Sequence, residues 1–385
     1  MQVETQNSTV PKLRFKEFED DLTIKPINSI LSIGSGKDYK HLDSGKIPVY
    51  GTGGLMTMVN KFLHEGESVC IGRKGTINKP IYLNEKFWTV DTLFYTHSFN
   101  AVEPKYIFYK FLNINWYKYN EASGVPSLSK ATIEKINLNL PTLPEQEKIA
   151  SFLSAVDERI QKLERKKSLL AAYKKGVMRQ LFSQELRFKD ENGNHFPDWE
   201  EKTLGDVGVF TSGTAFSNSE QGGNTGVSFL KVSDMNLTGN EFRITKANNY
   251  VNKEQIDRLK YKITISPSII FAKVGAAIFL ERKRIASNFL IDNNMMSFTP
   301  SGDIIFFKNL FDRIRLSKFA QVGALPSYNA SDLKTIKLNL PCLNEQQKIA
   351  SFLSGIDKKI ELVETQIQQS KTFKKGLLQQ MFVAA

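Results

Sequence analysis

The chain has 385 residues, and its 41% hydrophobic and 11% aromatic content is enough for two or three separate cores, which excludes a disordered chain. The 52 Lys and Arg against 40 Asp and Glu leave a net charge of +12, which favours polyanionic partners but would suit an anionic membrane equally well. No apolar run approaches the roughly 18 residues of a spanning helix, and residues 1–8 show no hydrophobic core of a signal peptide. We therefore expect a soluble cytoplasmic protein with no membrane partner.

Short β-prone runs separated by Gly, Asn and Pro predict two mixed α/β domains, each built on a curved sheet. In the first part of the chain these runs are residues 68–71 and 81–83, and in the second part they are residues 268–271 and 277–280. Weak correspondences at an offset of 200 residues, such as Pro126-Ser127 with Pro326-Ser327, link the two domains. Their interiors otherwise diverge, so we expect the two domains to perform different tasks.

A much stronger internal repeat organises the chain. Residues 138–183 recur as residues 338–383, and 22 of these 46 positions are identical. A fainter duplication places Leu13-Arg14-Phe15-Lys16 again at residues 186–189, so the segment between the two motifs is about 27 residues longer in the second copy. The predicted order is domain, helix, domain, helix, with boundaries at 1–143, 144–183, 184–342 and 343–385.

Both copies of the long repeat are predicted to be helices, because apolar residues recur every three or four positions. A continuous helix from Pro144 to Phe182 would measure about 58 Å, which is too long for one small core. The apolar stripe is close to a heptad seam, so we expect the two helices to pack on each other as a coiled coil. We expect an antiparallel pairing with a pseudo-two-fold axis, because the domain preceding each helix would then lie at an opposite end of the pair. The alternative is that each helix covers only its own domain.

The residues expected at the helix–helix or partner contacts are Ile149, Phe152, Val156, Ile160, Leu163 and Leu170 in the first helix and Ile349, Phe352, Ile356, Ile360, Val363 and Ile367 in the second. The predicted fold class is therefore α+β, with two mixed α/β domains joined by two long helices.

Sequence patterns for catalysis are incomplete. Residues 33–37 resemble a phosphate-binding loop, but the first Gly is not at the required spacing and Asp38 replaces the hydroxyl residue that would hold magnesium. Pro197-Asp198 followed by Glu200 and Lys202 resembles a nuclease carboxylate set, yet these residues are crowded in one short segment rather than placed on separate strands. The two Cys are far apart and the four His fall singly, without the spacing that zinc requires. We therefore expect no catalytic residue and no metal site.

Basic residues beside glycine turns are the remaining functional candidates. Arg73, Lys74 and Lys79 flank a Gly-bounded turn, which can present cationic groups to a phosphate or a guanine edge. The alternatives are ordinary solvated charge and, for Ser and Tyr, simple loop closure. The candidate DNA-binding residues are Lys37, Arg73, Lys74, Thr76, Lys79 and Ser127 in the first domain and Lys231, Lys273, Arg282, Lys283, Arg284, Ser327 and Tyr328 in the second.

At the duplicated helices the sequence resembles the specificity subunits of type I restriction–modification systems. The resemblance is carried by residues 143–150, Leu-Pro-Glu-Gln-Glu-Lys-Ile-Ala, and by residues 343–350, Leu-Asn-Glu-Gln-Gln-Lys-Ile-Ala. Residues 13–15, 186–188, 72–76 and 292–296 also look like parts of the target-recognition domains of that family. Asn344, where the first copy has Pro144, departs from the pattern at the start of the second helix.

The resemblance implies a non-catalytic subunit that recognises double-stranded DNA, each target-recognition domain reading one half of a split asymmetric sequence. It also implies two modification subunits, which bind S-adenosylmethionine and dock on the helices, and restriction subunits that use ATP and Mg. This chain itself is expected to bind no cofactor. The helices would set the spacer, with half-sites about one helical turn, roughly 34 Å, apart. Two alternatives stay open: a stand-alone DNA methyltransferase or nuclease, and an adaptor that binds proteins without touching DNA.

Overall fold

A computed structural model describes residues 10–321, 323 and 325–383 of the chain. By their contacts these residues form two compact units, which we call unit 1 (residues 10–167 with 362–383) and unit 2 (residues 168–361). Each unit contains one globular domain and parts of both long helices, α3 (Leu143–Phe182) and α7 (Leu343–Met381). The four-part division at 143, 183 and 342 stays a prediction, since the compact units cut across both helices.

Unit 1 is built on a six-stranded sheet with the strand order β2-β7-β5-β6-β3-β4 and a two-stranded sheet of β1 and β8. Its elements before α3 are β1 (Thr23–Pro26), η1 (Ile27–Ser29), β2 (Ser32–Ser35), β3 (Ser44–Gly51), β4 (Gly54–Val59), β5 (His64–Gly72), β6 (Ile81–Thr89), β7 (Leu93–His97), α1 (Pro104–Leu112), η2 (Trp116–Tyr119), α2 (Lys130–Glu134) and β8 (Asn137–Leu140). The predicted strands at 68–71 and 81–83 lie within β5 and β6.

Unit 2 contains a four-stranded sheet (β10-β16-β13-β14), a three-stranded sheet (β12-β11-β15) and the pair β17-β9. Its elements before α7 are β9 (Glu200–Thr203), β10 (Gly208–Ser212), η3 (Asn218–Glu220), β11 (Val227–Leu230), η4 (Val232–Asn236), β12 (Tyr250–Val251), α4 (Lys253–Leu259), β13 (Ser268–Ala272), η5 (Ala276–Leu280), β14 (Lys283–Ala286), β15 (Phe289–Ile291), β16 (Met295–Pro300), α5 (Ile304–Arg313), η6 (Leu316–Phe319), α6 (Ala330–Lys334) and β17 (Lys337–Leu340). Most of the extra length of the second copy lies between β10 and β13, which residues 213–267 separate, against residues 36–63 between β2 and β5. There β11 pairs with β15 in parallel and with β12 antiparallel, as β3 pairs with β6 and β4, while η3, η4 and α4 have no counterpart in unit 1.

The predicted strand at residues 277–280 is wrong, because this segment belongs to the 3-10 helix η5. Gly275 precedes it at φ 83° and Glu281 follows it at φ 50°, so the chain turns at both ends. Ile278 is 2% exposed and lies in the core of unit 2, whereas Phe279 and Leu280 are 59% and 55% exposed, so the run is only partly buried. A run of four apolar residues cannot by itself distinguish a strand from a turn of helix.

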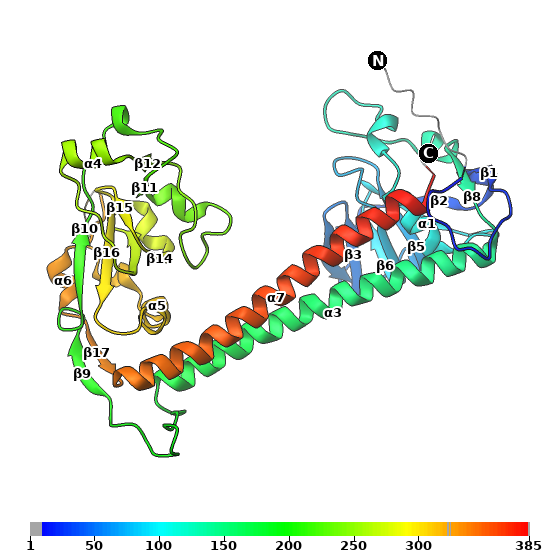
Figure 1. The fold of residues 1–385 in the computed structure, drawn as a ribbon. Coiled ribbons are helices and arrows are strands. Elements are labelled where there is room, and N and C mark those ends of the chain that lie inside the picture. The colour runs from blue at the N-terminus through cyan, green and yellow to red at the C-terminus, as the bar shows by residue number, and fades with distance from the viewer. Residues whose placement is uncertain (1–9, 322, 324, 384–385) are drawn as a thin grey trace. The chain divides into compact units, whose positions relative to one another are not determined.

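The two long helices pack on each other in an antiparallel arrangement, as predicted (Figure 1). In unit 1 the ion pairs are Asp157 with Lys374 at 2.6 Å, Glu164 with Lys371 at 2.7 Å, and Lys167 with Glu364, so positions rise along α3 as they fall along α7. In unit 2, Lys174 pairs with Asp357 at 2.7 Å. Lys174–Asp357 repeats the Asp157–Lys374 pair with the roles of the helices exchanged, which is the relation that a pseudo-two-fold axis produces.

The helices also complete the core of each globular domain. Ile149 and Leu153 of α3 lie in the core of unit 1 together with Leu377 and Met381 of α7. In unit 2 the equivalent cluster joins Ile349 and Leu353 of α7 to Val177 and Leu181 of α3. Each domain is therefore covered by the start of one long helix and the end of the other, so helix pairing and domain covering, treated as alternatives above, both occur.

The expected seam residues have two different environments. Phe152 packs against Phe15 and Phe352 against Phe188, with ring centroids 5.8 and 5.4 Å apart. These two seam residues therefore contact the short duplicated motifs as well as lying on the long helices. Of the other ten, Ile149, Ile160, Ile349, Ile356, Val363 and Ile367 are buried, and Val156, Leu163, Leu170 and Ile360 are half-buried.

A buried glutamate at the start of each helix anchors the short duplicated motif. Arg14 donates to both carboxylate oxygens of Glu145 at 2.8 and 2.7 Å, and Arg187 donates to those of Glu345 at 3.2 and 2.8 Å. The side chains of Glu145 and Glu345 are only 1% and 0% exposed. The bond to Glu145 raises the pKa of Arg14, so the guanidinium stays charged. The weak repeat at 13–16 and 186–189 is therefore a structural anchor.

The pairing of the helices predicts a charge-reversal result in unit 2. Lys174→Glu places two acidic groups at a half-buried contact, so we expect the free energy of unfolding to fall by about 1 kcal/mol. Adding Asp357→Lys should recover most of that loss. Urea unfolding followed by circular dichroism measures both, with Lys175→Glu at the adjacent exposed position as the control. A double variant no more stable than Lys174→Glu would contradict this register.

Candidate nucleic-acid interface

One turn and one loop come together in unit 1 through backbone hydrogen bonds. The turn follows β5, and Gly75 N donates to the carbonyl oxygen of Pro126 at 2.8 Å, while Leu128 N donates to that of Arg73 at 2.8 Å. The loop closes on itself because Glu121 N donates to the carbonyl oxygen of Ser127 at 2.9 Å. We call residues 73–76 with 121–128 turn–loop site 1.

Unit 2 contains the same backbone arrangement. Gly275 N donates to the carbonyl oxygen of Pro326 at 2.8 Å, and Tyr328 N donates to that of Lys273 at 3.0 Å. The loop again closes through Gln321 N and the carbonyl oxygen of Ser327, at 2.9 Å. We call residues 273–276 with the described residues of 321–328 turn–loop site 2. Each of these hydrogen bonds joins residues 200 positions after their counterparts in turn–loop site 1. The weak sequence correspondence at Pro126-Ser127 and Pro326-Ser327 therefore marks the same backbone conformation in both units.

Glycine is required at the corner of both turns. Gly75 has φ 91° and Gly275 has φ 83°, values that side-chain-bearing residues rarely adopt. A Cβ atom on Gly75 would have Thr52 Oγ1 as its neighbour at 3.9 Å, which places the β3–β4 hairpin beside turn–loop site 1. The corner exposes the residues on either side of it, and in unit 1 these include Arg73 and Lys74.

Turn–loop site 1 is an open, cationic pocket of about 520 Å³. Its lining residues are Arg73, Lys74, Asp91, Thr92, Ala122, Val125 and Ser127. The Arg73 guanidinium lies 5.8 Å from the centre of the Phe94 ring and donates a long hydrogen bond of 3.4 Å to the carbonyl oxygen of Asp91, so most of its donors stay free. Exposed Arg and Lys beside hydroxyl groups suit phosphate oxygens and guanine edges.

The remaining candidates of unit 1 do not line this pocket. Lys37 is exposed. Its backbone is hydrogen-bonded to β6, because Lys37 N donates to the carbonyl oxygen of Thr89 and the Lys37 carbonyl oxygen accepts from Trp88 Nε1. Thr76 is half-buried and Lys79 is exposed at the far end of the turn before β6. The structure thus brings Arg73, Lys74 and Ser127 to one pocket, which Lys37 and Lys79 do not line.

Turn–loop site 2 is less cationic than site 1. Lys273 is half-buried and donates to Ser212 Oγ at 3.2 Å, and position 274 is Val where site 1 has Lys74. Ser327 is half-buried and pairs with Val274 and Gln321. Lys231 donates to Gln221 at 3.1 Å, and Arg282 donates to Asn236, so both are engaged with neighbouring side chains.

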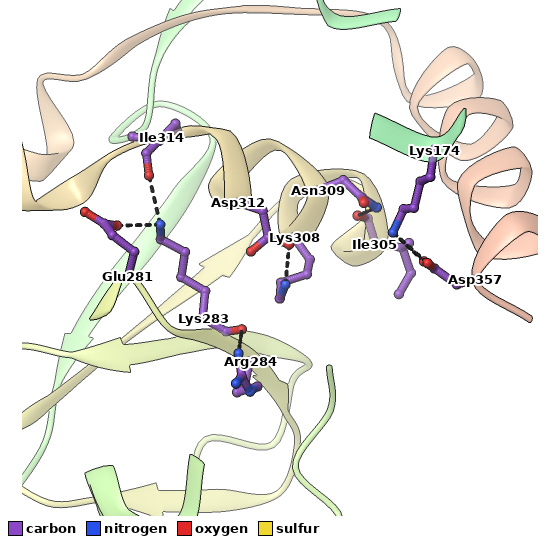
Figure 2. Close-up of polar contacts among 10 residues, drawn as sticks. All are labelled: Lys174, Glu281, Lys283, Arg284, Ile305, Lys308, Asn309, Asp312, Ile314 and Asp357. Carbon is purple, nitrogen blue, oxygen red and sulfur yellow. Dashed lines mark hydrogen bonds and ion pairs between the residues drawn. The ribbon is translucent and has the colours of Figure 1, made fainter. Parts of the chain in front are cut away.

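Two candidates of unit 2 are buried, which corrects their expected role in DNA contact. Lys283 is 2% exposed, and its ammonium group lies between Glu281, at 2.7 Å, and the carbonyl oxygen of Ile314, at 2.8 Å (Figure 2). Burial alone would raise the pKa of Glu281, but hydrogen bonds from Lys283 and Ser317 outweigh it and lower that pKa. Tyr328 is 3% exposed and its ring packs on Phe271.

Arg284 is turned partly inward as well. It donates to the carbonyl oxygen of Lys283 at 3.0 Å (Figure 2), its Nε is buried without a hydrogen-bond partner, and burial lowers its pKa. Lys308 on α5 is also buried and pairs with Asp312 at 2.5 Å, and in unit 1 the buried Lys110 donates to the carbonyl oxygen of Val383. Burial lowers the pKa of Lys110 to about 8. The net charge therefore overstates the charge available to a polyanion.

Sequence reasoning missed several residues of the two sites, including Thr92, Asp91 and the loop residues Val125 and Leu325. A signal was present, because Val125 and Leu325 are apolar residues immediately before the Pro-Ser pair that links the two domains. Across the described ranges, no three His, Cys, Asp or Glu side chains gather closely enough to hold a metal ion. The chemistry of both sites is that of binding by cationic, hydroxyl and apolar groups.

Comparisons with known proteins identify relatives over most of the chain. The family model for the type I restriction modification DNA specificity domain matches residues 19–171 and 197–371. The MjaVIII type I restriction enzyme specificity subunit of Methanocaldococcus jannaschii is 28% identical over 340 residues, which cover 80% of this chain and 74% of that protein. The resemblance predicted from the duplicated helices is confirmed. The matched family and relatives are named for specificity, and the prediction of a non-catalytic specificity subunit is confirmed at the level of the family.

Solved structures share the fold. The S subunit of a type I restriction–modification system from M. genitalium gives a TM-score of 0.62 at 15% identity, covering 97% of this chain and 99% of that one. A chain from a structure on complex assembly and conformational transition of the type I R-M system gives 0.58 at 13% identity, covering 95% and 97%. These matches confirm the predicted fold class. Among the helices of the described residues, none combines the length and apolar character needed to cross a lipid bilayer.

The burial of Lys283 predicts that it supports the fold. Lys283→Ala removes the ion pair to Glu281 and leaves a cavity, so we expect the free energy of unfolding to fall by about 3 kcal/mol. Lys273→Ala, at a half-buried position with one long hydrogen bond, should change it by less than about 1 kcal/mol. Urea unfolding of the two variants measures the difference. Equal stability of both variants would show that Lys283 is not held as described.

Proposed function

The chain belongs to the family of type I restriction–modification DNA specificity subunits, and on that premise we propose that it reads a two-part, asymmetric sequence in double-stranded DNA. One half is read by turn–loop site 1 and the other by turn–loop site 2. The observation that carries this proposal is the pair of equivalent hydrogen bonds, Gly75 to Pro126 and Gly275 to Pro326, which hold different side chains in the two units.

Different side chains on one backbone favour two different half-sequences. Site 1 offers the exposed Arg73 and Lys74, which match the acceptors of guanine and of phosphate. Site 2 offers Lys273, Val274 and Ser327, with fewer charged donors. Two identical sites would read a symmetric sequence, whereas these two read unlike halves. Contacts to phosphates supply most of the affinity and make it depend on salt.

The long helices supply docking surfaces for two identical modification subunits. Several exposed residues are identical in the two copies although helix packing does not require them, namely Ser151 and Ser351, Lys175 and Lys375, and Gln180 and Gln380. Leu143 and Leu343, at the starts of the helices, are 40% and 49% exposed. Exposed identities kept on both helices fit the same partner bound twice.

The other components of the complex carry the chemistry in this proposal. S-adenosylmethionine binds to the modification subunits, ATP and Mg bind to restriction subunits, and this chain binds no cofactor. The family also favours a cytoplasmic location, where such complexes meet DNA. The two competing functions are a stand-alone methyltransferase or nuclease and an adaptor that does not touch DNA. A methyl-transfer assay tests the first, and a DNA-binding experiment tests the second.

Selection from random DNA tests the proposal directly. The complex of this chain with its modification subunits should enrich a motif of two defined halves separated by an unspecified spacer. Arg73→Gln should relax one position in one half by about tenfold, because one bidentate contact to a base is lost, and leave the other half unchanged.

The outcomes distinguish the alternatives. Lys273→Gln is the matched variant in unit 2 and should affect only the other half. A complex whose affinity shows no sequence preference and no salt dependence would favour the adaptor. Methyl transfer to DNA by the purified chain alone, with labelled S-adenosylmethionine, would favour the stand-alone enzyme. Either result contradicts the proposal.

A separate prediction is that the length of the helix pair sets the length of the DNA spacer between the two half-sequences. Four residues inserted after Glu164 and four after Glu364 lengthen the helix pair by about 6 Å, so the spacer should grow by one or two base pairs at about 3.4 Å each. Both half-sequences should stay the same. Selection from random DNA measures the spacer, and four residues inserted between Asn192 and Gly193, outside the helices, provide the control. An unchanged spacer would contradict the ruler.

A further inference from the structure

The loop of each turn–loop site ends in an exposed apolar side chain. Val125 is 56% exposed and Leu325 is 64% exposed. They lie 200 residues apart, directly before Pro126 and Pro326, so they occupy the same position in the two sites. Loop tips usually carry small or polar residues, and neither side chain belongs to a hydrophobic core of its unit. An apolar side chain at this position in both copies therefore needs a reason other than packing.

The apolar tips are held beside the cationic turns. Val125 lines the same pocket as Arg73 and Lys74. In unit 2, a Cβ atom on Gly275 would lie 3.8 Å from Leu325 Cδ1, so the Leu325 methyl group sits against the corner of the turn. The hydrogen bonds from Gly75 to Pro126 and from Gly275 to Pro326 attach the residue after each tip to the turn. A ligand bound at either turn would therefore lie close to the methyl groups of Val125 or Leu325.

The chemistry of DNA limits what an apolar tip can recognise. In the major groove every base edge presents hydrogen-bond donors or acceptors, and thymine also presents its 5-methyl group. An apolar side chain placed against a donor or acceptor removes water from it without replacing the hydrogen bond. Placed against the thymine methyl group, the same side chain removes two apolar surfaces from water.

We propose that Val125 and Leu325 are specificity-determining residues, each contacting the 5-methyl group of one thymine in the half-sequence that its turn–loop site reads. This inference rests on the proposed function and adds to it the base and the atom that the loop recognises. The cationic residues of the turn hold the phosphate backbone or a guanine edge, and the loop tip selects the A·T pair beside it.

The test is a double-mutant cycle between one protein side chain and one methyl group. Deoxyuridine replaces each thymine of the target in turn, which removes only the 5-methyl group, and the dissociation constant of the complex with its modification subunits is measured. With the unmodified chain, we expect one position in each half-sequence to weaken binding about fourfold, the effect of about 0.8 kcal/mol for one buried methyl group.

The variants assign each position to one loop. In Val125→Ala, deoxyuridine should no longer weaken binding in the half-sequence that Arg73→Gln alters, while the effect in the other half persists. Leu325→Ala should give the mirror result. Val125→Thr keeps the shape of the side chain and should retain part of the effect. The matched controls are Ile24→Ala on β1 and Ile265→Ala, which shorten apolar side chains that are 67% and 75% exposed and lie outside the two turn–loop sites. They should leave the deoxyuridine effect in both half-sequences unchanged.

The failures are distinguishable. If the unmodified chain selects no two-part motif, the proposed function falls. If the two-part motif is present but no deoxyuridine position weakens binding, or if its effect is the same in Val125→Ala and Leu325→Ala as in the unmodified chain, only the role of the loop tips is overturned.

Discussion

Each long helix begins with a glutamate and a glutamine whose side chains are almost completely buried, and the other parts of its unit are attached through them. Glu145 and Glu345 hold the arginine of the short duplicated motif. The next residue, Gln146 or Gln346, donates to the carbonyl oxygen of the preceding Pro141 or Pro341 at 2.9 Å and accepts the backbone N–H that begins α1 or α5. Buried polar groups are costly unless they are satisfied, so this network defines where each domain meets its helix.

The turn–loop sites are built from residues outside this junction, so their side chains can differ while the junction stays the same. The same backbone bonds form both turn–loop sites, while their side chains change from Arg73 and Lys74 to Lys273 and Val274. Unit 2 adds η3, η4 and α4 between β10 and β13, and the backbone hydrogen bonds of the site are kept. A duplicated scaffold with divergent loops is suited to reading two different sequences, because loops tolerate changes that a buried network does not.

The net charge of the sequence overstates the positive charge at the surface, because several basic residues are buried. Lys110, Lys283 and Lys308 are buried and neutralised by local partners or lie against carbonyl oxygens, so they add to the net charge without adding to the binding surface. Sequence reasoning placed Arg73, Lys74 and Ser127 in one site because they flank glycine and proline turns, and the structure brings them together. It also included Lys283 and Tyr328, whose surroundings come from segments distant in sequence.

The duplication, the two long helices and the family could be read from residue order alone, because each depends on local periodicity or on identities at a constant offset, and the antiparallel pairing was inferred from that domain order. The helix η5 at residues 277–280, the packing of Phe152 and Phe352 on the short motifs, and the exposure of each cation required the folded structure. These features depend on which distant segments cover a residue. Burial is a property of three-dimensional packing, and neither composition nor spacing along the chain specifies it.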